Sequence, residues 1–164
     1  MINFEIFKEF LLNLIKEYGY FGIFLVGFSE PIFQPFPTEI FIVAGLLAGL
    51  DWKLVWIIST VACNLGAVVT YYLAIKYGKQ LMLKLFEKEK IDKGTFYLKK
   101  WGILGVIIAS FTPIPFEVIC WICDIFKMPF KKYMVAVFLS RLIRHGMVII
   151  PFVLKDHIHF WLIL

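Results

Sequence analysis

Four long apolar regions dominate the chain, and prolines interrupt two of them. The regions cover about residues 19–50, 54–76, 101–128 and 133–154. The second and fourth hold ~22 residues each, and at a rise of about 1.5 Å per residue each can cross the ~30 Å apolar core of a bilayer once as a helix. With 61% hydrophobic residues among 164, the chain has more apolar surface than a soluble domain of this size can bury. The pattern predicts an all-α polytopic membrane protein.

The first and third apolar regions each contain the pattern P-x-P-x-E near the middle. Proline removes a backbone donor and fixes φ, so it ends or kinks a helix. In hydrocarbon, a broken backbone is tolerated only where it is buried in protein or lines a wet cavity. We therefore expect two re-entrant helical hairpins that turn at Pro35 and Pro37 and at Pro113 and Pro115. Two short crossings in each region are the alternative.

The two motifs are superimposed by a shift of 78 positions, which pairs their prolines and their glutamates. Each half then consists of an amphipathic helix, a broken hairpin and one span. Because one span separates the copies, the second half enters from the opposite face, as in the inverted-topology repeats of secondary transporters. Within a single membrane domain, 1–164, we expect repeat 1 at about 1–78, an amphipathic link at about 79–100, repeat 2 at about 101–154 and an interfacial tail at 155–164.

Lysines concentrate in the middle of the chain. Residues 76–100 hold eight of them, and Lys127, Lys131 and Lys132 fall on the same side under this topology. The positive-inside rule then places the central segment in the cytoplasm of a cell-membrane protein and both termini on the opposite side. The formal net charge of +5 has the same explanation, so nucleic acid is not the expected partner. The N-terminal amphipathic segment is expected to lie in the interface or to pack on the protein.

Cysteine and histidine pairs are present but incomplete as metal sites. Cys120 and Cys123 form a C-x-x-C pair inside an apolar run, and His157 and His159 form a second pair in the tail. A structural zinc site needs four ligands, and a redox C-x-x-C needs a βαβ context. We therefore expect packed cysteines, no metal, no cofactor and no enzymatic activity.

Seven ionisable residues fall inside apolar regions, where a charge at the bilayer centre costs about 2.5 to 3.5 kcal/mol on insertion scales. Arg141 and Arg144 are three residues apart and share one helix face. Because arginine keeps its charge, both side chains need a hydrogen-bond acceptor. One interpretation is structural, with Glu39 and Glu117 forming buried ion pairs with both arginines. The other is functional, because a guanidinium also binds phosphate and a membrane carboxylate can carry a proton. The seven are Glu30, Glu39, Glu117, Asp124, Arg141, Arg144 and His145.

Three segments resemble the DedA family, whose members carry the so-called VTT or SNARE-associated domain. They are "FSEPIFQPFPTEIFIVAG" (28–45), "GAVVTYYLAIKYG" (66–78) and "SFTPIPFEVICWICDIFKMPFKKY" (110–133). The typical second hairpin of the family carries two arginines, and Ser110 and Phe116 occupy those positions here. The span containing "SRLIRHG" instead resembles the YqaA-type branch. The resemblance implies an inverted-repeat lipid transporter, since bacterial members translocate polyprenyl-phosphate carriers and eukaryotic relatives scramble phospholipids.

Together these features predict a membrane transporter, flippase-like or scramblase-like, that moves an anionic phosphate-headed lipid. Arg141 and Arg144 are the expected phosphate ligands, and four embedded acids are candidates for proton coupling: Glu39, Glu117, Glu30 and Asp124. Membrane lipids are then the partners, and homo-oligomerisation is left open. Two alternatives stay open: an ion-coupled transporter of a small solute, and a non-transporting scaffold whose buried ion pairs are only structural.

Overall fold

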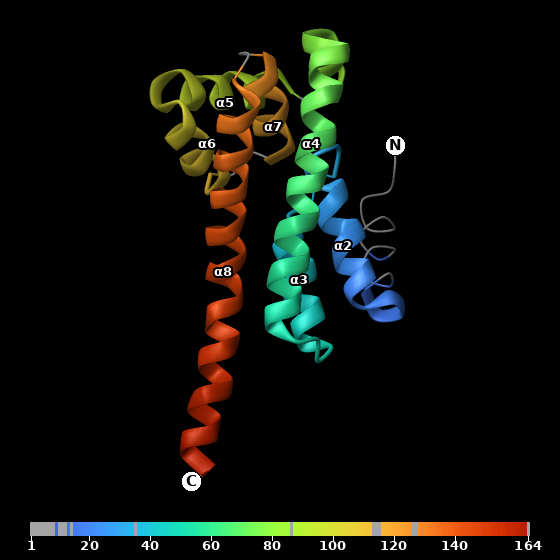
Figure 1. The fold of residues 1–164 in the computed structure, drawn as a ribbon, viewed down its shortest axis with the longest axis vertical. Coiled ribbons are helices and arrows are strands. Elements are labelled where there is room, and N and C mark those ends of the chain that lie inside the picture. Colours follow the sequence, from blue (N-terminus) through green and yellow to red (C-terminus); the bar gives the residue numbers. More distant parts are fainter. Residues whose placement is uncertain are drawn as a thin grey trace.

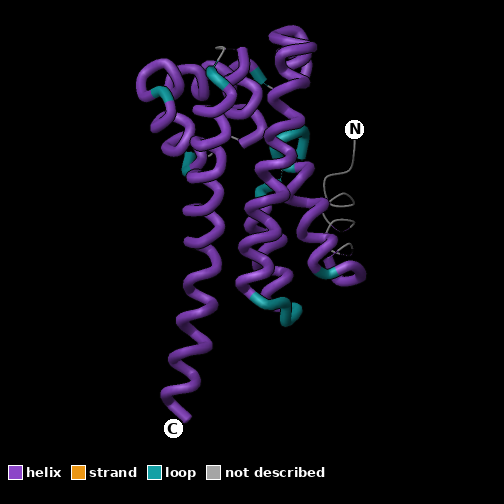
Figure 2. Tube along the Cα trace, in the orientation of Figure 1, coloured by secondary structure: helices purple, strands orange, loops and turns teal. Residues whose placement is uncertain are grey.

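The protein is helical throughout the part of the chain that the structure describes (Figures 1 and 2). This computed structural model describes residues 9, 13, 15–34, 36–85, 87–112, 116–125 and 128–163, of which 78–83, 85, 124–125 and 155–163 are described by their backbone only. The predicted all-α class is confirmed. The predicted N-terminal amphipathic helix falls largely outside the described residues.

The first broken region forms a helical hairpin. It consists of α2 (Tyr20–Ser29) and α3 (Thr38–Leu47), and in Figure 1 both open ends of this hairpin face downward, toward the end of the molecule where α8 ends. Pro37 stands in extended conformation directly before α3, with φ of −67° and ψ of 134°. Proline thus separates the two helices as predicted, whereas Pro35 lies outside the described residues. After a short turn the chain continues into α4 (Trp52–Leu85).

The second broken region forms another hairpin with its open ends at the opposite end of the molecule (Figure 1). An amphipathic helix, α5 (Lys88–Trp101), precedes α6 (Ile103–Ser110), α7 (Phe116–Ile125) and the long α8 (Phe130–Ile163). Pro113 and Pro115 lie outside the described residues, between α6 and α7. The element order of the first half therefore occurs again in the second. An inverted symmetry between the halves stays a prediction.

The two long helices run antiparallel and pack against each other (Figure 1). Each has 34 residues, about 51 Å at the usual rise. Within them, Trp52–Tyr77 and Phe130–Leu154 are apolar and long enough to cross a membrane. The predicted crossing segments are thus confirmed in length, but both helices continue beyond them. The backbone of α8 stays helical through Ile163, and the interfacial position of residues 155–164 stays a prediction.

Glycines allow the backbones of neighbouring elements to approach closely. A Cβ added at Gly66 of α4 would overlap the carbonyl oxygen of Phe28 in α2, and one added at Gly105 of α6 would overlap that of Tyr97 in α5.

On α5 the buried residues Ile91, Gly94 and Leu98 recur at helical spacing. This face packs on α6 and α7, so α5 is amphipathic. The link expected at about 79–100 stays a prediction, since α4 extends to Leu85 and α5 begins at Lys88.

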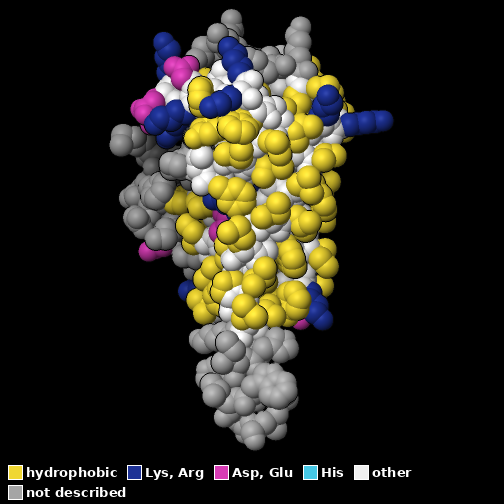
Figure 3. All heavy atoms as spheres, turned by 90° about the vertical axis from the view of Figure 1, so that its left-hand side faces the viewer, with side chains coloured by type: hydrophobic (Ala, Val, Ile, Leu, Met, Phe, Trp, Pro, Cys, Tyr) yellow, Lys and Arg dark blue, Asp and Glu magenta, His cyan; other side chains and the backbone are white. Residues whose placement is uncertain are grey.

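An apolar belt crosses the middle of the face that Figure 3 shows, and lysines gather at one end of this face. Many large apolar side chains point outward from both long helices, among them Ile57, Tyr72, Met147 and Ile150. A soluble monomer rarely exposes so extensive an apolar surface, whereas contact with lipid requires one. Acidic and basic spots are also visible within this belt (Figure 3).

Candidate functional site

The turns of both hairpins meet α8 near Arg141 and Arg144, and the two arginines converge on acids of the first hairpin. In Arg141, Nη2 lies 3.2 Å from Oε1 of Glu30 and Nη1 lies 3.4 Å from Oε1 of Glu39. In Arg144, Nε lies 2.7 Å from the same oxygen of Glu39. Glu30 directly follows α2 and Glu39 lies in the first turn of α3, so the two carboxylates flank one turn. We refer to Glu30, Glu39, Arg141 and Arg144 as the charge cluster.

The same arginines also contact the second hairpin. Nη1 of Arg144 donates a hydrogen bond to the carbonyl oxygen of Ser110. The guanidinium carbon of Arg141 lies 3.4 Å from the ring centroid of Phe116, a cation–π contact. Ser110 and Phe116 are the positions that the family resemblance associates with arginine. In this protein the guanidinium groups next to Ser110 and Phe116 belong to α8. The resemblance instead expects arginines at positions 110 and 116 themselves.

A polar network holds the first turn in place. The hydroxyl of Thr38 donates to Oε2 of Glu30 at 2.6 Å, and the side-chain amide of Gln34 donates to the carbonyl of Phe36 at 2.9 Å. Two helices from outside the hairpin also reach it. Thr70 of α4 donates to the carbonyl of Pro31 at 2.9 Å, and the indole of Trp121 in α7 donates to that of Ile32 at 3.1 Å. The orientation of Glu30 toward α8 follows from these contacts.

The structural interpretation of the sequence predicted one ion-pair partner of the arginines wrongly. It paired both arginines with Glu39 and Glu117, whereas Glu30 takes the place of Glu117 in the ion pairs of the described residues. Phe116 already lies against Arg141, and successive residues of a helix point about 100° apart. Glu117 is buried in the first turn of α7, and among the described residues no ion pair joins it to either arginine. Asp124 belongs to the same helix, and its side chain lies outside the described ones.

One side of the charge cluster is accessible from outside. The side chain of Arg141 is fully buried, whereas those of Arg144 and Glu39 are 23% and 12% exposed. In the described part of the chain, Oε2 of Glu39 and Nε of Arg141 are buried without a hydrogen-bond partner. The cluster thus has an exposed edge and donors and acceptors to spare, which a purely structural set of ion pairs does not need.

A second polar group, beside the cluster, was missed by sequence reasoning. Nδ1 of His145 lies 3.1 Å from the hydroxyl of Ser59, and Sγ of Cys63 lies 3.5 Å from Oε2 of Glu30. Ligand atoms of Glu30, Cys63 and His145 all lie within 4.8 Å of one another, so these three could hold a metal ion. A signal was available, because Ser59 and Cys63 are four residues apart, as are Arg141 and His145, and such pairs share a helix face.

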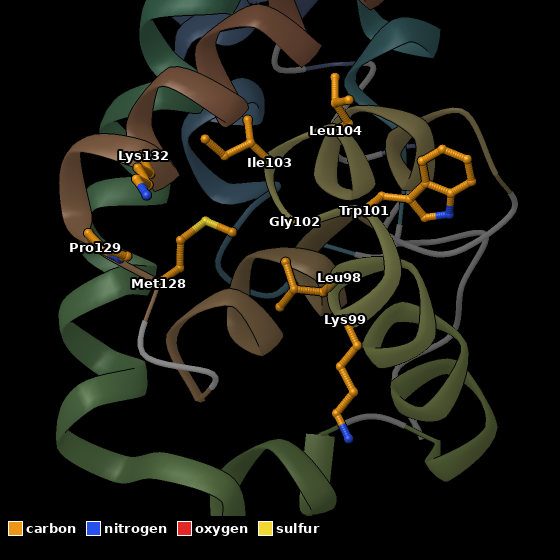
Figure 4. A pocket seen from close by; sticks show the side chains of 9 residues that line it. All are labelled: Leu98, Lys99, Trp101, Gly102, Ile103, Leu104, Met128, Pro129 and Lys132. Carbon is orange, nitrogen blue, oxygen red and sulfur yellow. The ribbon is translucent and has the colours of Figure 1, made fainter.

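A pocket of about 490 Å³ lies apart from the cluster, where α5 and α6 meet the start of α8 (Figure 4). In Figure 4 the side chains of Leu98, Ile103 and Met128 point toward its centre, whereas the chain of Lys99 extends away from it. Its lining is Leu98, Lys99, Trp101, Gly102, Ile103, Leu104, Met128, Pro129 and Lys132.

Comparison with known proteins identifies the family. The model of the VTT domain matches residues 35–152. The chain is 84% identical over 160 residues to an uncharacterized protein, MJ0201, of Methanocaldococcus jannaschii, with 98% of this chain and all of that one covered. It is 31% identical over 137 residues to an uncharacterized membrane protein, YbfM, of Bacillus subtilis, covering 76% of this chain and 83% of that protein.

A third relative is undecaprenyl phosphate transporter A of Staphylococcus aureus, 25% identical over 123 residues, which are 65% of this chain and 59% of that protein. No solved structure matches the chain with significance. The matched residues include α3, α4, the second hairpin and three members of the charge cluster, whereas α2 and Glu30 precede them. The chain is therefore a helical membrane protein that belongs to the VTT domain (DedA) family.

Proposed function

We propose that the protein moves an anionic phosphate-headed lipid across the membrane and that Arg141 and Arg144 bind the phosphate. One observation carries the proposal: two guanidiniums from one helix lie where the turns of both hairpins meet, inside an apolar belt. A guanidinium fork matches phosphate oxygens in two parallel hydrogen bonds. The name of the staphylococcal relative supports the same class of substrate.

Binding would proceed by exchange of one anion for another. Arg144 is the more exposed arginine, and its partner Glu39 is the more exposed acid. A phosphate that reaches this edge replaces the carboxylate of Glu39 on Arg144 and then approaches Arg141. The lipid tail stays in the surrounding bilayer against the apolar belt. This order places Arg144 as the first contact and the Arg141–Glu30 pair as the inner limit of the site.

The displaced acids make coupling to protons or cations part of the proposal. A carboxylate that loses its arginine partner within an apolar surrounding must gain a proton or another cation. Glu39 would do so first, and Glu30 would follow if the phosphate reaches Arg141. Glu117 and Asp124 are further acids on α7. The proposed activity involves no bond cleavage, so we assign no enzymatic role.

We also propose an orientation in the cell membrane. The lysine-rich end of the molecule includes α5 and the start of α8. The positive-inside rule places this end in the cytoplasm and the open end of the first hairpin on the opposite side. The pocket of Figure 4 lies at this lysine-rich end and combines apolar walls with Lys132. A lipid entering from the cytoplasmic leaflet would meet it before the arginines.

A flux measurement tests the proposal. Purified protein is reconstituted into vesicles that carry a fluorescent polyprenyl phosphate in one leaflet and, in parallel samples, fluorescent phosphatidylglycerol. Wild-type protein should accelerate the exchange of at least one probe between leaflets. Arg144→Gln should lower that rate at least about tenfold, the effect of losing about 1.4 kcal/mol or more of phosphate binding. Lys131→Gln removes an exposed charge of α8 away from the cluster and should leave the rate unchanged.

The two alternatives give different results in the same vesicles. A scaffold whose ion pairs are only structural predicts no lipid exchange, and it predicts that Arg144→Gln and Glu39→Gln change only stability. An ion-coupled solute transporter predicts uptake of a soluble anion without movement of either lipid probe. Equal lipid exchange by wild type and by folded Arg144→Gln protein would remove Arg144 from the site.

A further inference from the structure

Three potential metal ligands from three distant segments lie together beside the charge cluster. Glu30 follows α2, Cys63 belongs to α4 and His145 belongs to α8. All three are buried, with 2%, 0% and 0% of their surfaces exposed. One ligand atom from each lies within 4.8 Å of the other two. A carboxylate, a thiol and an imidazole in this arrangement form a mixed oxygen, sulfur and nitrogen set.

Two hydroxyl groups of α4 lie next to one nitrogen of the His145 ring. The hydroxyl of Ser59 donates to the carbonyl of Trp56 at 3.2 Å, so its oxygen can accept from Nδ1 of His145 at 3.1 Å, and the hydroxyl of Thr60 lies 3.4 Å from the same nitrogen. With the proton on Nδ1, Nε2 carries the lone pair. Nε2 is buried and has no hydrogen-bond partner in the described part of the chain. Outer hydrogen bonds of this kind orient metal-binding histidines in general.

The two carboxylate oxygens of Glu30 have different partners. Oε1 faces Arg141 at 3.2 Å, whereas Oε2 accepts from Thr38 at 2.6 Å and lies 3.5 Å from Sγ of Cys63. One carboxylate can therefore keep its ion pair through Oε1 and bind a cation through Oε2. Thr38 Oγ1 lies 3.9 Å from the same sulfur, so its hydroxyl borders the site as well.

We propose that Glu30, Cys63 and His145 bind a divalent transition-metal ion, with Zn²⁺ as the best match. Thiolate and imidazole ligands favour zinc over the oxygen-seeking Mg²⁺ and Ca²⁺. The metal replaces the thiol proton of Cys63, which is released to solvent, and a water or the Thr38 hydroxyl completes four-coordination. Ligand atoms of tetrahedral zinc are ~3.5 Å apart, so the three groups need to move together by about 1 Å.

The charge of the surroundings is compatible with a bound cation. The charge cluster contains two carboxylates and two guanidiniums and is neutral. A Zn²⁺ ion bound with the Cys63 thiolate adds one positive charge, and the buried carboxylate of Glu117 on α7 can balance it. The site joins the first hairpin to both long helices and does not depend on the proposed lipid transport.

Cobalt titration of the purified protein in detergent tests the proposal. After treatment with a chelator, the wild-type protein should bind one equivalent of Co²⁺ and develop a thiolate-to-cobalt charge-transfer band that Zn²⁺ abolishes. Zn²⁺ should also raise the melting temperature, because a ligand that binds only the folded state stabilises it. Absence of the band together with an unchanged melting temperature overturns the proposal.

Variants then locate the ligands. Cys63→Ser should abolish the band, whereas Cys120→Ser and Cys123→Ser, which alter the other two buried cysteines, should retain it. The double variant His157→Ala/His159→Ala should retain it too. A band that survives Cys63→Ser, or is lost in Cys120→Ser, assigns the metal elsewhere. X-ray absorption of the wild-type zinc complex gives an answer even if a variant does not fold, because one sulfur scatterer supports the site, and two sulfurs or none refute it.

Discussion

The two hairpins meet α8 through different chemistry. The first presents carboxylates, with Glu30 and Glu39 on either side of its turn. The second presents a backbone carbonyl at Ser110 and an aromatic ring at Phe116. Arg141 forms ion pairs with the first hairpin and a cation–π contact with the second. Arg144 binds a carboxylate oxygen of the first hairpin and a backbone carbonyl oxygen of the second. One pair of side chains on a long helix therefore holds both turns.

The arginines occupy a different part of the sequence from the one where the family resemblance expects them. The family resemblance expects arginines at Ser110 and Phe116, on the second hairpin itself. Here the guanidiniums come from α8 and reach the same two positions. The acids of the first hairpin, in contrast, remain on the turn.

The largest effect is expected from Arg141→Leu, which breaks the link to the first hairpin. It leaves Glu30 buried without its guanidinium, and removal of one partner from a buried ion pair costs about 3 to 5 kcal/mol. Arg144→Gln should cost less, about 1.5 to 3 kcal/mol, because this side chain is partly exposed. Denaturant unfolding in detergent micelles measures both free energies.

The double variant Glu30→Leu/Arg141→Leu is the control for this prediction. Well-packed apolar residues often replace a buried ion pair with no loss of stability, so the double variant should recover most of the stability that Arg141→Leu loses. If Arg141→Leu and Arg144→Gln destabilise the protein equally, the first hairpin does not depend on Arg141 as described here.

Sequence reasoning predicted the helices better than it predicted their contacts. The helical class, the two long spans and the breaks before Thr38 and after Ser110 follow from apolar length and from proline, both of which act locally. The common face of Arg141 and Arg144 follows from their spacing. Each of these features depends on residues that are close along the chain.

The partners of the arginines depend on the path of a turn, which no local pattern gives. Glu30 meets Arg141 because Thr38, Thr70 and Trp121 fix the turn after α2, and two of these residues come from other helices. The group of Glu30, Cys63 and His145 joins three segments in the same way. For this reason the sequence pointed to Glu117 as a partner, and its spacings showed shared helix faces without showing that Glu30, Cys63 and His145 meet.

An intermediate effect is expected where glycines allow close approach in each half. Gly66→Ala forces a Cβ into the carbonyl of Phe28, and Gly105→Ala forces one into that of Tyr97. Overpacking of this kind costs about 1 to 3 kcal/mol, measurable by the same unfolding experiment. Gly66→Ala should also lower lipid exchange, because Phe28 lies two residues before Glu30, whereas Gly105→Ala should affect stability alone. Equal loss of exchange in both variants would contradict a special role for the first turn.

The smallest effects are expected from the two hydrogen bonds that reach the first turn from other helices. Thr70→Val removes a donor to Pro31 from within the same half, and Trp121→Phe removes a donor to Ile32 from the other half. Each should cost about 0.5 to 1.5 kcal/mol in the free energy of unfolding. Because both bonds hold the same short turn, their effects should not be additive. A double variant whose loss in the free energy of unfolding equals the sum of the two single losses would contradict this prediction. In that case α4 and α7 would position the acids of the first hairpin independently of each other.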